Sequence, residues 1–224
     1  MIPKTIHFCW FGKKRKSRFI KNCIRSWEQK LPDYKIICWT EKNLPVKHPF
    51  MEAALKKGYF AFASDFARLY VIQQYGGIYF DTDVLVLKSF DKLLQYDFFL
   101  GEELPGRINL AVFGAIPNHP IINRFLKFYD TSSFNSSNLP IISNCLTIIF
   151  DEIKHDMMQQ NDRVFDANYF YPLPYDKRVD NYENYVVEET FAVHLWNKSW
   201  GNVNDLITEK KYISAFAKMI NYLY

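Results

Sequence analysis

Features that define several other classes of protein are missing from this sequence of 224 residues. No apolar run approaches the roughly 20 residues that a membrane-spanning helix needs. The first residues, MIPKTIHFCWFG, lack the basic head, apolar stretch and small-residue cleavage site of a signal peptide. The chain also shows no internal repeat, no interdomain linker and no nucleic-acid-binding motif. We therefore expect one cytoplasmic domain over residues 1–224 that does not bind nucleic acid.

Cysteine is scarce, and its four occurrences are far apart. Cys9, Cys23, Cys38 and Cys145 all sit among apolar neighbours. This pattern predicts buried thiols in a reducing compartment rather than disulfides or a zinc site.

The residues that are present are typical of a folded domain with a large core: 49% are hydrophobic and 18% are aromatic. In the first half, strand-like segments alternate with helix-like ones: strands at 4–10, 34–39 and 75–87, helices at 17–32, 51–58 and 61–77. Such alternation predicts an α/β fold with a mainly parallel, Rossmann-like sheet flanked by helices.

The second half is less regular. Its strand-like segments are 97–103, 108–115 and 190–196, and its helix-like segments are 119–130 and 206–224. Residues 168–185 form an irregular stretch rich in Tyr and Pro, of the kind that often shapes a binding surface.

Two carboxylates interrupt the apolar run YGGIYFDTDVLVL. In an extended chain Asp81 and Asp83 would point to the same side, where they would repel each other unless a cation compensates. Three roles fit the pair: ligands of Mg²⁺ or Mn²⁺, the nucleophile Asp81 of a haloacid-dehalogenase-like phosphatase, or a structural or lectin-like calcium site in a non-catalytic sugar-binding protein. The phosphatase motif carries Thr where this chain has Leu85.

The helix before this run adds further polar groups. Asp65 and Arg68 are three residues apart and share a helix face, which by itself indicates an intrahelical ion pair. The helix ends in Gly76 and Gly77 and leads directly into the strand, so we expect these charges to reach the same sheet edge as Asp81 and Asp83.

Three segments together resemble glycosyltransferase family 32, whose catalytic core is shared by the large clostridial glucosylating toxins. The segments are IPKTIHFCWFG, SDFAR…YGGIYFDTD and HLWNKSW. The resemblance implies a GT-A fold with a nucleotide-sugar-binding half, residues 1–87, and an acceptor half, residues 88–224. It also implies a retaining, metal-dependent transfer from a nucleotide sugar, UDP-sugar favoured, to a glycan or lipid-linked acceptor in bacterial surface polysaccharide synthesis.

The resemblance assigns the donor site to five residues. Trp10 would stack on the nucleotide base, and Ser64 would lie near the nucleoside. Asp65 and Arg68 would grip the hydroxyls of the donor sugar, and Tyr79 would pack against the donor.

The metal and leaving-group residues follow from the same resemblance. Asp83 would bind Mn²⁺ or Mg²⁺ directly, and Asp81 would reach the metal and the ribose. His194 would be the third ligand, although a lone histidine in FAVHLW also fits a core position. Lys198 and Trp200 would contact the diphosphate. Asn109 is a further candidate sugar contact, with turn stabilisation as the alternative.

Positive charge is concentrated near the beginning of the chain. Residues 1–60 hold 14 Lys or Arg and 4 Asp or Glu, and many of the basic residues lie in KKRKSRFIK, Lys13 to Lys21. A solvated surface would account for this run. Together with the amphipathic segment 206–224, it also predicts peripheral contact with the anionic inner face of the cell membrane.

Overall fold

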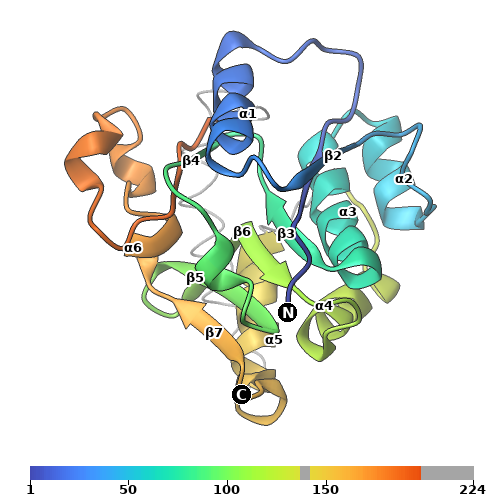
Figure 1. Ribbon diagram of the computed structural model, residues 1–224. Helices are drawn as coiled ribbons and strands as arrows, with labels where there is room; N and C mark the ends of the chain where they lie inside the picture. The colour runs from blue at the N-terminus through green and yellow to red at the C-terminus, as the bar shows by residue number, and fades with distance from the viewer. Residues whose placement is uncertain (137–141, 198–224) are drawn as a thin grey trace.

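A computed structural model describes residues 1–136 and 142–197, and Figure 1 shows their arrangement around a six-stranded sheet. The strand order is β2-β1-β3-β6-β5-β7. The strands are β1 (Thr5–Cys9), β2 (Lys35–Trp39), β3 (Gly77–Phe80), β5 (Phe98–Leu104), β6 (Arg107–Ala115) and β7 (Asp162–Phe165). β1 runs parallel to β2 and β3, and β5 runs parallel to β7, whereas β6 is antiparallel to both β3 and β5. The expected α/β fold with a mainly parallel sheet is confirmed.

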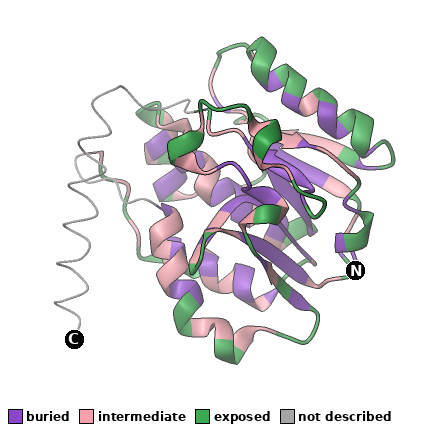
Figure 2. Cartoon of the chain, turned by 90° about the vertical axis from the view of Figure 1, so that its left-hand side faces the viewer, coloured by how far each residue is buried: buried purple, intermediate pink, exposed green. Residues whose placement is uncertain are grey.

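Helices cover both faces of this sheet. They are α1 (Arg18–Lys30), α2 (Pro49–Lys56), α3 (Phe60–Tyr75), α4 (Pro120–Asp130), α5 (Ile142–Met157) and the short α6 (Ala167–Phe170). Strand β3 shows why two cores form, because successive strand side chains point to opposite faces. Tyr79 packs in a core with residues of α2 to α5, while Ile78 and Phe80 pack in a second core that includes Trp27 of α1. Figure 2 shows the sheet as a largely buried layer inside exposed helices.

A second, two-stranded sheet lies beside α1. It pairs β4 (Val84–Val86) antiparallel with β8 (Ala192–His194), with Val84 opposite His194. The Trp27 indole N–H donates to the Val84 carbonyl at 2.7 Å, and the Val86 N–H donates to Ser26 Oγ at 2.9 Å. α1 is thereby fixed to the edge strand that follows the two aspartates.

The stretch 75–87 is not one continuous strand, as the sequence had suggested. β3 ends at Phe80, and Asp81 to Asp83 form a turn whose Val84 N–H donates to the Asp81 carbonyl. The chain turns here because it leaves the large sheet and enters the small one. The two carboxylates therefore project from a turn between sheets and do not alternate along a strand.

The two glycines before β3 have a clear structural reason. Gly76 and Gly77 both have positive φ, 61° and 101°, which favours glycine. A Cβ on Gly77 would lie 2.6 Å from the Thr5 carbonyl oxygen. Only glycine lets α3 turn back so closely against β1, and the predicted end of the helix is confirmed.

Two elements of the second half were not anticipated. β7 has four residues and pairs only with β5 among the described strands, so its pattern is short and partly polar. α5 buries Ile142, Leu146, Ile149 and Phe150, a helical spacing that is visible in the sequence. Residues 168–185 contain α6 and two short 3₁₀ turns, Tyr175–Lys177 and Tyr182–Tyr185.

The four cysteines are free, as expected, but the predicted burial holds only for Cys9 and Cys23, since Cys38 and Cys145 are partly exposed. Within residues 1–136 and 142–197, no helix has the length and apolar character needed to cross a bilayer. The expected amphipathic helix at 206–224 lies outside the described residues. The division into halves at residue 87 stays a prediction.

Candidate active site

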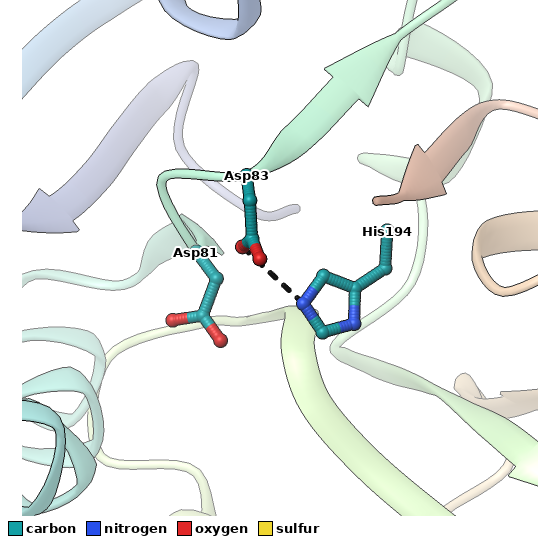
Figure 3. Close-up of side chains that lie close together, drawn as sticks. All are labelled: Asp81, Asp83 and His194. Atoms are coloured by element: carbon teal, nitrogen blue, oxygen red, sulfur yellow. Dashed lines mark ion pairs between the residues drawn. The ribbon is translucent and has the colours of Figure 1, made fainter. Parts of the chain in front are cut away.

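Asp81, Asp83 and His194 form a compact cluster, shown in Figure 3. The pairing of β4 with β8 explains it: His194 lies opposite Val84, so it reaches the residue just before Val84. His194 Nε2 is 3.3 Å from Asp83 Oδ1. One ligand atom from each of the three residues can be chosen so that all lie within 4.8 Å of one another.

The surroundings shift the pKa values of Asp83 and His194 in opposite directions. Burial disfavours the Asp83 carboxylate, but the adjacent His194 and the Asn197 N–H, 2.8 Å from Oδ2, outweigh it and lower the pKa of Asp83. Burial also opposes charge on His194, yet Asp83 raises the pKa of the imidazole above its ordinary value. The pair is held in place by this attraction when nothing else binds it.

Arg68 connects the cluster to α3. Its guanidinium lies 2.8 Å from Asp65 Oδ1 and 3.2 Å from Asp81 Oδ1, and it donates to the Leu110 carbonyl at 3.0 Å. The ion pair expected from the spacing of Asp65 and Arg68 is present, and it extends to Asp81. Arg68 lies over the ring of Tyr79, with 5.0 Å between the guanidinium carbon and the ring centroid.

The two carboxylates beside Arg68 are desolvated but still accessible. Burial raises the pKa of Asp65 to about 6, with Arg68 opposing the shift and Asp81 adding to it. Burial likewise raises the pKa of Asp81, against the lowering effect of Arg68. The side chains of Asp65 and Asp81 remain 20% and 26% exposed, so a polar ligand can reach both carboxylates.

The other donor-binding residues predicted from the sequence, Tyr79, Ser64 and Trp10, lie on β3, on α3 and directly after β1. Tyr79 is 1% exposed beneath Arg68, so its contact with a donor stays a prediction. Ser64 is on α3 and donates to the Phe60 carbonyl. Trp10 follows β1 and is half-buried, and its indole N–H donates to the Lys14 carbonyl at 2.9 Å. Lys198 and Trp200 lie outside the described residues.

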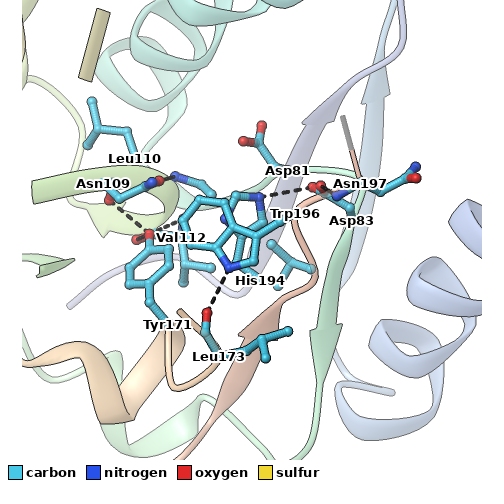
Figure 4. A network of polar contacts seen from close by, with 12 residues as sticks. Asp81, Asp83, Asn109, Leu110, Val112, Tyr171, Leu173, His194, Trp196 and Asn197 are labelled. Carbon is cyan, nitrogen blue, oxygen red and sulfur yellow. Dashed lines mark hydrogen bonds and ion pairs between the residues drawn. The ribbon is translucent and has the colours of Figure 1, made fainter. Parts of the chain in front are cut away.

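Sequence reasoning missed a polar network on β5 and β6, part of which is shown in Figure 4. The Tyr171 hydroxyl donates to the Asn109 carbonyl at 2.8 Å and accepts from the Val112 N–H at 3.0 Å. Asn109 is in strand β6 rather than in a turn; its amide accepts from the Ala111 N–H and donates to Glu103 at 2.5 Å. Unlike Asp81, which follows β3, Glu103 lies within β5, so no simple sequence signal marks it.

Trp196 is a second residue that the sequence reasoning missed. Its ring centroid lies 4.1 Å from that of His194, and its indole N–H donates to the Leu173 carbonyl at 2.7 Å. The residue has φ 52°, an uncommon value for a bulky side chain. This backbone conformation places the indole against the imidazole and restricts its orientation.

The cluster suits a divalent cation. Two carboxylates and one imidazole supply two oxygens and one nitrogen, and only the carboxylates are hard ligands of the type that Mg²⁺ prefers. Arg68 occupies one side of Asp81, whereas among the described residues Asp83 has His194 and the Asn197 N–H as its polar partners. The residues present therefore fit a divalent metal ion.

Two family models match the chain: the first includes Asp81 and Asp83, and the second includes His194. Residues 17–100 match the glycosyltransferase sugar-binding region containing DXD motif, and residues 117–220 match the alpha 1,4-glycosyltransferase conserved region. The first match includes Asp65, Arg68, Asp81 and Asp83.

Curated relatives point to the same class. The chain is 26% identical over 160 residues to a human alpha-1,4-N-acetylglucosaminyltransferase and 28% identical over 142 residues to inositol phosphoceramide mannosyltransferase 3 of Schizosaccharomyces pombe. These matches cover 66% and 60% of this chain but only 46% and 39% of those proteins. A mimivirus protein named as an uncharacterised glycosyltransferase, L373, is 25% identical, with 95% of this chain and 90% of that protein covered.

Solved structures share the fold. The PaToxG glycosyltransferase superposes with a TM-score of 0.54 at 22% identity, covering 68% of this chain and 70% of its own. A glycosyltransferase that modifies the major capsid of PBCV-1 gives 0.52 at 14% identity, covering 86% and 94%. The fold is that of the GT-A glycosyltransferases. In the segment that matches the sugar-binding region, the DXD motif reads Asp81-Thr82-Asp83.

Proposed function

We propose that this protein transfers a sugar from a nucleotide-sugar donor, with retention of configuration and with the help of a divalent cation. One observation carries the proposal: Asp81, Asp83 and His194 gather within 4.8 Å of one another, directly beside the Asp65–Arg68 pair. Carboxylates and an imidazole for a cation, adjacent to a carboxylate and a guanidinium for hydroxyl groups, suit a substrate that carries both a diphosphate and a sugar.

Each residue then has a defined task. Asp83, Asp81 and His194 would hold Mn²⁺ or Mg²⁺, which when bound supplies positive charge to the diphosphate leaving group. Asp65 would accept hydrogen bonds from sugar hydroxyls, and Arg68 would donate them while keeping Asp65 and Asp81 at a fixed separation. Trp10, at the end of β1, offers an indole face for the nucleotide base.

The proposed transfer needs no separate enzymic base. The acceptor hydroxyl attacks the anomeric carbon on the face from which the diphosphate departs, and a leaving-group oxygen takes its proton. UDP-sugar is the favoured donor, and the acceptor is a glycan or a lipid-linked oligosaccharide. By their names, one relative transfers N-acetylglucosamine and another transfers mannose to inositol phosphoceramide, and the second name supports a lipid-borne acceptor. A role in bacterial surface polysaccharide synthesis stays a prediction.

The decisive experiment is a screen of nucleotide sugars that measures released nucleoside diphosphate in the presence of Mn²⁺. One donor should be turned over by the native protein, and the Asp83→Asn variant should lose this turnover. Asp151→Asn is the matched control, because Asp151 is exposed on α5 and pairs with Lys154. Equal turnover by the native protein and Asp83→Asn would contradict the proposal.

The two alternatives from the sequence are less well supported. A phosphatase would use Asp81 as nucleophile, but that carboxylate is engaged by Arg68, and the fold is that of transferases. Phosphate release from an aryl phosphate would favour it. A non-catalytic sugar-binding protein would bind a nucleotide sugar with Mn²⁺ and release no nucleoside diphosphate, so the same screen distinguishes it.

A further inference from the structure

Positive charge without neighbouring acidic residues is concentrated in the segment that leads from β1 into α1, at the top of Figure 1. We define the basic face as the cations between residues 13 and 25: Lys13, Lys14, Arg15, Lys16, Arg18, Lys21 and Arg25. All except the half-buried Lys16 are exposed. Residues 10–27 include no Asp or Glu, so the basic face has no internal counter-charge.

The basic face also lacks acidic partners in the described part of the chain, although Lys16 lies over the rings of Phe8 and Trp10. In the part of the chain that the structure describes, none of its cations forms an ion pair, whereas Lys4, Arg68, Arg107 and Lys154 all do. Long cationic side chains that are left exposed and unpaired cost little in water, but they create a positive potential that attracts an anionic surface.

An aromatic side chain lies within this charged surface. Phe19, between Arg18 and Lys21 in the first turns of α1, is 38% exposed. Basic residues combined with an exposed aromatic ring are the composition of segments that lie on lipid headgroups, where the ring enters the boundary with the acyl chains. A soluble polyanion would use the charges but would gain nothing from Phe19.

The basic face is continuous with the candidate active site. Its segment leaves the carboxyl end of β1 directly after Trp10, and Lys16 Nζ lies 5.2 Å from the centroid of the Trp10 ring. The other face of α1 packs on β4, which begins directly after Asp83. A bilayer that binds the basic face therefore lies next to Trp10 and the candidate active site.

We propose that the basic face docks this protein on an anionic lipid bilayer and so brings a lipid-linked acceptor to the site. The delivery of a lipid-linked acceptor rests on the proposed function, whereas the docking does not. The segment 176–189 lies near α1 and carries the acidic residues Asp176, Asp180, Glu183, Glu188 and Glu189. An anionic bilayer is repelled by this acidic segment. It therefore contacts the loop before α1 and the first turns of α1.

The test is cosedimentation of the full chain with vesicles of phosphatidylcholine alone or with 30% phosphatidylglycerol, at about 0.1 M salt. Binding is expected only to the anionic vesicles. The variant Lys13→Gln/Lys14→Gln/Arg15→Gln should partition about 100-fold more weakly, since each surface cation near such a bilayer contributes about a factor of five. The control Lys56→Gln/Lys92→Gln/Lys127→Gln loses the same charge from exposed positions elsewhere and should bind like the native protein.

Three outcomes overturn the inference, and the first two are no binding to anionic vesicles and equal weakening by both triple variants. Binding that soluble polyphosphate abolishes while Phe19→Ser leaves it unchanged would instead indicate a polyanionic partner, and it also overturns the inference. None of these measurements uses donor turnover, so the docking can fail while the proposed transferase activity stands, and the reverse.

Discussion

At the scale of single residues, Arg68 is the group on which the site depends most. It is 8% exposed and touches Asp65, Asp81 and the Leu110 carbonyl at once. Without its charge, two partly buried carboxylates would face each other with no cation between them. The geometry of the candidate active site and the stability of the fold are therefore coupled through one side chain.

We expect Arg68→Gln to lower the free energy of unfolding by about 3 kcal/mol, because removing one partner of a buried ion pair leaves the other uncompensated. Urea denaturation at pH 7 measures this change. Arg163→Gln is the control, since Arg163 is exposed on β7 and its replacement should change stability by less than about 0.5 kcal/mol. Adding Asp65→Asn to Arg68→Gln should recover part of the loss, and a strictly additive double variant would contradict the coupling.

At the scale of elements, the site depends on how β6 is held. β5 and β6 lose their regular register near Gly101 and Glu102, and the Tyr171 hydroxyl compensates by bonding to Asn109 and Val112 of β6. β6 in turn supplies the Leu110 carbonyl to Arg68 and the Ala111 carbonyl to the Asp81 N–H. Strand β6 thus positions the charged side chains of Arg68 and Asp81, which lie on other elements.

Tyr171→Phe should therefore destabilise the fold by about 1–2 kcal/mol, because it leaves a buried N–H and a buried carbonyl without their shared partner. Thermal and urea denaturation report the change. Tyr75→Phe removes the hydroxyl of a 45% exposed tyrosine and should have little effect. If the two variants were equally stable, the hydroxyl of Tyr171 would not be what holds the strand.

Strand β1 introduces a dependence of stability on pH. His7 is fully buried, its Nδ1 accepts from the Trp39 indole N–H at 3.0 Å, and burial lowers its pKa to about 4. Between pH 6.5 and 4 the unfolded chain takes up a proton that the folded protein does not. Stability from this group is therefore complete above pH 6.5 and is lost as the pH falls towards 4, by on the order of 2–3 kcal/mol.

Urea denaturation at a series of pH values tests this behaviour. His7→Gln should show a shallower decline in stability between pH 6.5 and 4 than the native protein. His155→Gln, at an exposed position on α5, should follow the native curve. Parallel curves for His7→Gln and the native protein would assign the acid sensitivity to other groups.

Sequence predicted the elements of the first half well because their patterns are strong. The glycines that end α3, the alternation of helices with strands and the apolar core strands could all be read from the sequence. The turn at Asp81–Asp83 was not, because an apolar run does not reveal where a chain changes sheets. The Asp83–His194 contact could be expected only through a family resemblance, since nothing local to residue 83 indicates β8. Glu103 and Tyr171 were missed because their importance arises from the irregular pairing of β5 with β6.

At the scale of the whole molecule, ligand binding should stabilise the fold measurably. A ligand present at 100 times its dissociation constant adds about 2.7 kcal/mol, which for a chain of this size raises the melting temperature by roughly 5–10 °C. We expect Mn²⁺ and UDP together to produce such a shift in differential scanning fluorimetry. Neither should do so alone, because the diphosphate completes the coordination of the cation.

The same measurement has an internal control. Asp83→Asn should abolish the joint shift, while Asp151→Asn should retain it. A shift of equal size in Asp83→Asn would place the nucleotide elsewhere on the protein.

The pairing of β4 with β8 has a consequence for biosynthesis. Asp83 and His194 are about 110 residues apart in sequence, and they meet only when the last described strand joins the small sheet. In a nascent chain Asp81, Asp83 and His194 therefore cannot meet until residue 194 has left the ribosome. A polypeptide truncated before β8 would keep its DXD motif but would bind the cation with only two of the three ligands, so metal retention would report whether synthesis had run past residue 194.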